Sequence, residues 1–471
     1  MWRGLALLAA CVLSEAIAAP AALAELPTAE EVAQLKEELR HMQDAMRQMQ
    51  AELQTLKAQQ QTPAARTALP EPVAERGSLT ERVETLEESV KASEEGQDSL
   101  LKRLDEMVEL DVYTASVFSN LTDKDAKFDA LHVELLADAH PTDRLRGFTQ
   151  IRFSRLGTIE AGAKQGDIEV HQAWLEYAIN DYFNPRLGVV LVPFGKYNQE
   201  NFDHVQELTL RPVMALRVVP TTWAEPGFGF TGHAPLGEQL GGIGLKDFLL
   251  DYQLFLTTGL SADIRDHRGL RDARAEYETD TNNNKATVGR LGIKPMRDLE
   301  VGLSGYLGEY DTLGHHINGF DVDSKLTIGP FDLLGEYALF DLQEGGFRLD
   351  NSTSPPSITT AIVPESLRGG YLEAHYRFWF DFLNDTFLGR KFQNPTFTAA
   401  LRYDQVRIDD DSDAGSGPIV HRGWTFGLNY RPIPTWVLKF EYIVNDEKTE
   451  AINTRDVDDR DGFVMSMAAA F

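Results

Sequence analysis

The chain has 471 residues, a formal net charge of -28 and an isoelectric point near 4.8, so its length allows several domains or one large barrel with an appendage. The acidic balance argues against nucleic acid, because phosphate binding needs clustered lysine and arginine. The mean hydropathy is -0.29 and no apolar run of about 18 residues follows the N-terminus, which excludes transmembrane helices but leaves a transmembrane β-barrel open.

Residues 1–24 predict a signal peptide for export. Arg3 supplies an early positive charge, an apolar stretch follows, and Ala18 and Ala24 suit cleavage. The only cysteine, Cys11, lies inside this stretch, so the mature protein would contain no thiol and no disulfide. The letters LAAC around Cys11 also spell a lipoprotein-like box, but the apolar run continues past it and favours an ordinary signal.

Residues 25–58 predict a coiled coil, because apolar positions recur at alternating spacings of three and four. A stripe of this kind is equally typical of a helix packed on its own domain. The segment 25–77 contains almost no aromatic or β-branched residue for a second core layer, so we expect its seam to pack against copies of itself in a homo-oligomer. Leucine and methionine at both seam positions do not distinguish a dimer from a trimer. The seam comprises Val32, Leu35, Leu39, Met42, Met46, Met49, Leu53 and Leu56.

Residues 59–77 predict a linker, since Pro63, Pro70 and Pro72 remove backbone donors and end the helix. A second coiled coil is predicted over residues 78–110, with polar residues in the middle of its seam that can fix the register. This seam comprises Leu79, Val83, Leu86, Val90, Ser93, Gln97, Leu100, Leu104 and Met107.

Residues 111–471 predict an all-β transmembrane barrel of about 16 antiparallel strands, since about 14 to 16 alternating stretches follow Leu131. In the stretch 371–380, for example, apolar residues alternate with Glu373, His375 and Arg377. Two strands, near Leu210 and Gly227, are the least clear. A barrel of this size encloses a water-filled lumen.

The connections between these strands favour a barrel over a soluble β-sandwich, which also alternates. The turns KPMRD, GPFD and RPIP are tight, whereas other connections, such as DDDSDAGSGP, are long and acidic. Short turns at one rim and long loops at the other are typical of outer-membrane barrels. Five aromatic residues near predicted strand ends suit an interfacial girdle: Trp174, Tyr177, Trp379, Trp424 and Trp436.

The stretch 171–212 contains a tryptophan-bearing strand, a short turn and then RLGVVLVPFG followed by a polar loop. In this it resembles the phosphate-selective porin O and P family. The terminal GFVMSMAAAF looks like the aromatic signal that the barrel-assembly machinery reads in such proteins, with Phe471 as the signal residue. The resemblance implies a trimeric 16-stranded channel in which the segment after Gly195 folds inward and narrows the pore.

The phosphate selectivity of that family rests on rows of basic residues in the lumen. Here the predicted inward-facing strand positions mix basic with acidic residues, while the long loops are strongly acidic, so we expect a weak preference for cations. The candidate pore-lining residues are Arg152, Lys196, Arg211, Arg217, Glu373, Arg377, Arg402, Asp404, Lys439 and Glu441.

Two acidic runs of the predicted loops could bind Ca²⁺, but solvated loop charge bridged by divalent ions to lipid headgroups is the favoured interpretation. The runs are Asp409, Asp410, Asp411 and Asp413, and Asp456, Asp458, Asp459 and Asp461.

The sequence has no metal-ligand pair of helical spacing, no glycine-rich phosphate loop and no nucleophile motif, so we expect no enzyme, cofactor or metal. The predicted function is passive diffusion of small polar solutes or ions through the outer membrane. Both chain ends, and hence the stalk, would lie in the periplasm. The expected partners are copies of the chain, most simply in a trimer, outer-membrane lipids and the barrel-assembly machinery. The alternative is a structural tether that joins the outer membrane to the cell wall through the stalk.

Overall fold

The structure is a computed structural model. It describes residues 107–122, 125–154, 167–200, 202–243, 245–264, 268–274, 285–343, 347–350, 357–360, 363–409, 418–448 and 461–471. The chain divides into two compact units between Glu106 and Met107, and the described residues all belong to the second. The predicted signal peptide, linker and first coiled coil lie outside the described residues, as does all of the second coiled coil before Met107, so they stay predictions.

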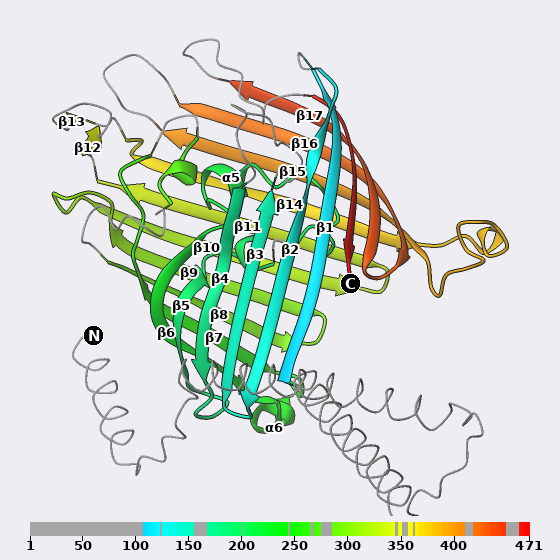
Figure 1. The fold of residues 1–471 in the computed structure, drawn as a ribbon, viewed down its shortest axis with the longest axis horizontal. Coiled ribbons are helices and arrows are strands. Elements are labelled where there is room, and N and C mark those ends of the chain that lie inside the picture. The colour runs from blue at the N-terminus through cyan, green and yellow to red at the C-terminus, as the bar shows by residue number, and fades with distance from the viewer. Residues whose placement is uncertain are drawn as a thin grey trace, which may run out of the picture. The chain divides into compact units, whose positions relative to one another are not determined.

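Sixteen strands of the described chain form one closed barrel, in which each strand pairs antiparallel with its neighbours (Figure 1). β1 pairs with β18, and this closes the wall. The strands are β1 (Val108–Leu121), β2 (Lys127–Thr142), β3 (Leu145–Ser154), β4 (Asp167–Tyr177), β5 (Asn184–Leu191), β6 (Ala224–Pro235), β7 (Leu249–Thr257), β8 (Ala286–Met296), β9 (Leu299–Glu309), β10 (His316–Ile328), β11 (Phe331–Leu342), β14 (Ser366–Phe378), β15 (Thr396–Asp409), β16 (Ile419–Ile433), β17 (Trp436–Lys448) and β18 (Gly462–Ala470). A separate hairpin of β12 (Phe347–Asp350) and β13 (Ser357–Thr360) lies in the connection between β11 and β14.

The first strand begins at Val108, three residues before the predicted start of the barrel at 111. Its register with β2 already runs from Val108 opposite Ala139, so residues 108–110 are strand and not the end of a coiled coil. Of the two unclear strands, the one at Gly227 is real and lies in β6, whereas Leu210 lies in the connection between β5 and β6.

The two rims of the barrel differ, as the sequence predicted. One rim, here called the turn rim, carries the tight turns at 297–298, 329–330 and 434–435 and both ends of the barrel chain. The opposite loop rim carries most of the long connections. Two longer connections depart from this rule at the turn rim: 236–248, with α6 (Gly237–Leu240) and η1 (Gly241–Ile243), and 379–395, with η3 (Asp381–Leu383).

The wall is polar inside and apolar outside, which is the reverse of a soluble protein. On β14, Leu372 is 69% exposed on the outer face while its neighbour Glu373 is 5% exposed on the inner face. β17 repeats the arrangement with exposed Phe440 beside buried Lys439 and Glu441. Hydrocarbon can solvate the first face but not the second, so the alternation fits a barrel in lipid. Among the described residues, no helix is long and apolar enough to cross a membrane.

The predicted aromatic girdle is wrong for Trp174. This side chain is only 7% exposed and lies on the inner face of β4, where the Arg186 guanidinium carbon lies 3.9 Å from its ring centroid. Tyr177, Trp424 and Trp436 are exposed as predicted. Trp174 lies in phase with Gln172 and Glu176 along β4, which places it on the polar face.

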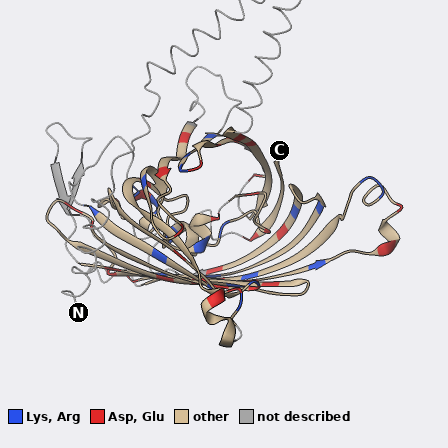
Figure 2. Ribbon diagram, turned by 90° about the horizontal axis from the view of Figure 1, so that it is seen from below, with Lys and Arg blue, Asp and Glu red and all other residues tan. Residues whose placement is uncertain are grey.

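Two connections from the loop rim fold into the barrel. The first, residues 192–223 between β5 and β6, is called the inner segment and contains α4 (Lys196–Gln199) and α5 (Met214–Arg217). The second, between β7 and β8, contains η2 (Leu270–Asp272), which contacts α5. Figure 2 shows short helices and loops within the curve of the wall, with charged residues among them. An apolar cluster fills the space between these connections and the inner wall.

Candidate functional site

The inner segment leaves the wall at a narrow neck. Val192 donates its backbone N–H to the Trp223 carbonyl over 3.0 Å, so the two ends of the segment meet. The Asn198 side chain joins them again: its amide donates to the carbonyls of Val192 and Trp223 over 2.9 and 3.0 Å, and its oxygen accepts from the Trp223 N–H over 2.8 Å. The neck therefore satisfies its own buried backbone groups inside the barrel.

Gly195 turns the chain inward at the end of the LVPFG motif. Its φ of 73° lies in the region that favours glycine, and an added Cβ would overlap the Glu336 carboxylate. The Gly195 N–H donates to the Ser304 hydroxyl of β9 over 3.2 Å. The chain after Gly195 therefore folds inward, as the sequence resemblance implied, and α4 comes to lie against the wall.

Residues 192–199 and 213–223 are called the root of the inner segment, and apolar packing holds them. Phe194 and Trp223 are fully buried, with ring centroids 4.9 Å from Phe340 and 5.3 Å from Tyr306 respectively. The Trp223 indole also donates to Glu225 over 2.7 Å. The root therefore forms part of a small hydrophobic core inside the lumen.

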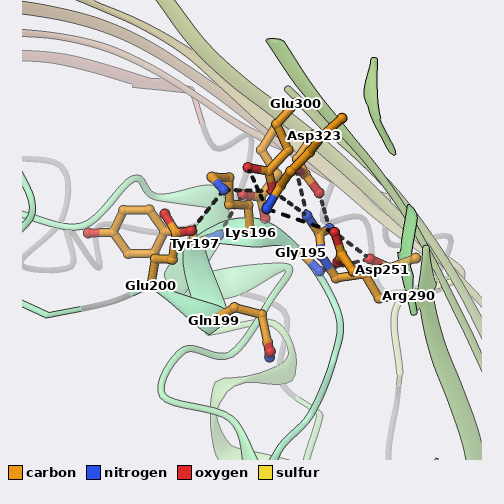
Figure 3. A network of polar contacts seen from close by, with 12 residues as sticks. Gly195, Lys196, Tyr197, Gln199, Glu200, Asp251, Arg290, Glu300 and Asp323 are labelled. Carbon is orange, nitrogen blue, oxygen red and sulfur yellow. Dashed lines mark hydrogen bonds and ion pairs between the residues drawn. The ribbon is translucent and has the colours of Figure 1, made fainter. Parts of the chain in front are cut away.

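Lys196 of α4 joins the root to the wall through charge (Figure 3). Its ammonium lies 2.8 Å from Glu200 and 3.0 Å from Glu300 of β9, and Lys294 of β8 lies 3.6 Å from the same Glu300. Burial by itself would lower the pKa of Lys196, but the two carboxylates outweigh it and the pKa lies above its ordinary value.

Near Lys196 lies an acidic cluster on β10 and β11, which consists of Asp321, Asp323 and Glu336. Arg290 is bidentate to Asp323, with one N–O distance of 2.9 Å. Glu336 accepts from the Tyr197 N–H over 2.9 Å. Asp321 is fully buried, and neither of its carboxylate oxygens has a hydrogen-bond partner among the described residues. Asp321 and Glu336 both lie near Gly195, while the Arg290 guanidinium pairs with Asp323.

Residues 202–211 are called the tip of the inner segment, and polar groups of the opposite wall hold them. Lys439 of β17 donates to the carbonyls of Asp203 and Leu208 over 2.8 and 3.4 Å. Glu441 on the same strand accepts from the backbone N–H groups of Thr209 and Leu210. Both wall side chains are buried, so they bind the tip and are shielded from solvent.

Two further wall side chains and an ion pair complete the attachment of the tip. Asn429 donates to the Glu207 carbonyl over 2.6 Å, and Arg431 donates to the His204 carbonyl over 2.8 Å. Asp203 lies 2.8 Å from His132 of β2. Burial would raise the pKa of Asp203, but the pairing with His132 and the nearby cations outweigh it and hold the pKa below its usual 3.8.

α5 lies against β14 and β15 at a third polar position. The Val213 N–H donates to Asp404 over 3.2 Å, and Arg402 donates to the other oxygen of Asp404 over 2.8 Å. Arg402 also lies 3.5 Å from Glu373, which pairs with His375 over 2.6 Å. The inner segment thus contacts wall strands on several sides of the lumen.

The structure brings some of the predicted pore-lining residues together and separates others. Lys196, Glu373, Arg402, Asp404, Lys439 and Glu441 take part in the networks described above, around the inner segment. Arg152 pairs with Glu134 on the inner wall, and Arg377 pairs with Asp332 near the turn rim over 2.6 Å. Arg211 donates to the Thr221 carbonyl within the inner segment over 2.5 Å, and Arg217 is buried at the end of α5.

Sequence reasoning missed the acidic cluster and the residues that fix the neck and the tip. Asp321 and Asp323 alternate in a stretch of period two, and that signal could have placed both on the inner face. Asn198 lies in the single helical turn α4 and Asp203 in irregular chain, and neither segment is long enough to show a periodicity that marks them.

No group of three or more histidine, cysteine, aspartate or glutamate side chains is arranged to hold a metal ion within the described ranges. Of the two acidic runs, the structure describes only Asp409 and Asp461. Asp409 pairs with Arg368 and Arg407, and the backbone N–H of Asn445 donates to Asp461 over 2.7 Å. Calcium binding by the remaining acidic residues lies outside the described chain.

No protein-family model matches the chain. An uncharacterized protein of Aquifex aeolicus (strain VF5) is 24% identical over 308 residues, which cover 63% of this chain and 65% of that protein. The chain thus matches less than two thirds of the length of this relative.

The matched solved structures include outer-membrane porins. OmpF of Salmonella typhi, in complex with daunomycin, is 14% identical and covers 77% of this chain and 97% of its own, with a TM-score of 0.48. The anion-selective porin from Comamonas acidovorans is 11% identical over 77% of this chain and 99% of its own, also with a TM-score of 0.48. The trimer form of OmpT from Vibrio cholerae is 12% identical over the same shares, with a TM-score of 0.47.

Proposed function

We propose that the chain is an outer-membrane porin, a passive diffusion channel for small polar solutes or ions. The observation that carries this proposal is the inverted wall: a closed barrel of sixteen strands with a polar interior and an apolar exterior. An inner segment inside the lumen supplies the means of selection, since it narrows the path that a solute can take.

The aperture would lie beside the tip of the inner segment. Apolar packing fills the lumen around the root, whereas Val205 of the tip is 52% exposed and Leu210 is also exposed. Because part of the lumen is filled, we expect a smaller conductance than an empty barrel of sixteen strands would give.

We expect a weak preference for cations, because the charges on the inner face are mixed while the long connections at the loop rim are rich in aspartate. The described basic side chains near the inner segment are engaged: Lys196 and Arg402 by carboxylates and Lys439 by carbonyls. The acidic cluster at Asp321 is buried beside the root and does not line the path beside the tip. Among the described residues this arrangement offers no row of unpaired cations for phosphate, which argues against the selectivity that the porin O and P resemblance would imply.

The stalk and the oligomeric state belong to the same proposal. An even number of strands puts Met107 and Phe471 at the turn rim, so a stalk built from residues 25–58 and 78–107 would enter the periplasm with Phe471 as assembly signal. A trimer of barrels would bring three stalks within reach of one another. The alternative function, a tether to the cell wall through this stalk, rests on the same predicted coiled coils.

Single-channel recording in planar bilayers, with a salt gradient across the membrane, tests the proposal. We expect small ohmic steps and a reversal potential that indicates weak preference for cations. Correctly folded protein that produces no conductance steps would contradict the channel and favour the tether. A saturating anion current that phosphate blocks would instead restore the selectivity of the porin O and P family.

A further inference from the structure

The outer face of the wall carries a groove of about 640 Å³ over β10, β11, β14 and β15. Gly335 and Gly370, on adjacent strands, form its floor, since neither has a side chain to fill the space. Tyr337, Leu372 and Tyr403 stand around it. Because these residues lie on the lipid side of the wall, the groove is of a shape and polarity that an acyl chain can occupy.

One end of the groove is positively charged. Arg368 and Arg407 are direct cross-strand partners on β14 and β15, and the Asp409 carboxylate accepts from both, over 3.0 and 2.6 Å. Two guanidinium groups thus share one carboxylate, although like charges directly opposite each other destabilise a sheet. Arg422 of β16 is also exposed. Its cross-strand partner is Gln405, which lies two residues from Arg407 along β15.

This charged end lies near the loop rim. Arg368 and Arg407 are each the third residue from the loop-rim end of their strand. Tyr403 lies four residues from Arg407 along β15, on the side away from the loop rim, and is the cross-strand partner of Trp424. Their ring centroids are 4.9 Å apart, and aromatic residues of this kind are typical of the membrane interface. Of the two floor glycines, Gly370 is level with Gln405, two residues from the arginine pair, and Gly335 is level with Leu372 and Tyr403.

We propose that this groove binds a phosphorylated glycolipid of the outer leaflet, with its phosphate on Arg368 and Arg407 and one acyl chain along Gly335 and Gly370. Guanidinium groups bind phosphate through paired hydrogen bonds. The Asp409 carboxylate neutralises one of the two guanidinium charges, so the other remains to attract the phosphate. The inference rests on the proposed function only in that the loop rim faces the outer leaflet. It requires no particular solute or conductance.

Native mass spectrometry of the detergent-solubilised full chain, titrated with purified lipid A, tests the inference. Phosphatidylethanolamine and inorganic phosphate serve as separate probes. We expect the double substitution Arg368→Gln and Arg407→Gln to weaken lipid A binding about tenfold or more. Arg297→Gln is the matched control, because Arg297 is 83% exposed at the turn rim.

A second variant tests the acyl half of the site. Gly335→Leu fills the floor, and the nearest atom to its Cβ would be the flexible end of Leu372 at 2.9 Å, so the sheet can accommodate it. We expect this variant to lose lipid A while it keeps its heat-modifiable mobility and its conductance. Equal lipid A affinity in both variants and the wild type would overturn the inference. Full competition by inorganic phosphate alone would also overturn it, since the site would then recognise an anion without its acyl chain.

The same preparations separate this inference from the proposed function. Wild-type protein that conducts but binds lipid A no better than the double variant leaves the porin intact and removes the lipid site. Protein that binds lipid A specifically but does not conduct keeps the site and removes the channel.

Discussion

The root and the tip of the inner segment are held in different ways. The root is embedded in apolar side chains such as Phe340 and Tyr306, where each contact adds to a shared core. The tip contributes the buried Leu208 but is held chiefly by single polar groups such as Lys439 and Glu441, whose hydrogen bonds go to its backbone. The difference indicates that the root belongs to the stability of the barrel, whereas the tip can be released without unfolding it.

The largest effect is expected from Trp223→Ala at the root. This change removes a fully buried ring from the apolar cluster and should lower the free energy of unfolding by about 3–5 kcal/mol. Thermal unfolding followed by heat-modifiable electrophoresis measures it. Phe382→Ala, at an exposed position in the turn-rim connection, is the control and should change stability little. Equal loss in both variants would show that the cluster does not stabilise the barrel.

Gly195→Ala tests how far the root depends on the turn that leads into it from the wall. A Cβ at this positive φ is strained and overlaps Glu336, so we expect a loss of about 1–3 kcal/mol together with an altered conductance. Gly329→Ala is the matched control, because its φ of 58° is similar but no atom lies within 4 Å of the added Cβ. If the two variants behave alike in conductance, backbone strain alone accounts for the effect and the contact with Glu336 does not matter.

Lys439→Met should release the tip while the root stays packed. The change removes the donor to the carbonyls of Asp203 and Leu208, at a cost of about 1–3 kcal/mol. We expect the single-channel conductance to rise. Lys325→Met, on the inner face of β10 nearer the turn rim, serves as the control. A conductance that stays at the wild-type value would mean that the tip does not depend on Lys439.

The smallest effect is a dependence on acid. The pKa of Asp203 lies below its unfolded value of 3.8, so its attachment to His132 contributes stability that is fully present above that value. The contribution is lost as the pH falls from about 4 toward the lower, folded pKa. We expect a constant conductance from pH 8 to about 4 and an increase below it, absent in Asp203→Asn. Conductance that changes between pH 8 and 6 would point to another group.

The sequence predicted the wall well because a strand in lipid has one apolar face, and period two shows it directly at positions such as Leu372 and Glu373. The LVPFG motif also located the inner segment, since Gly195 is the residue that turns it inward. Period two gives no information outside the strands, which is why Asn198 in α4 and Asp203 in the tip were missed. Trp174 shows a different limit: an aromatic near a strand end suggests a membrane interface, but its phase, with Arg186 beside it, puts it in the lumen.

The central claim is that solutes pass beside the tip of the inner segment, and Val205 tests it most directly. Cys11 is the only cysteine and lies in the predicted signal peptide, so Val205→Cys would provide a single reactive thiol in the mature protein. Modification by a bulky charged thiosulfonate should lower the single-channel current in Val205→Cys and leave it unchanged in Leu313→Cys, an exposed position in the connection between β9 and β10. An unaltered current after complete modification of the Val205→Cys thiol would contradict the claim.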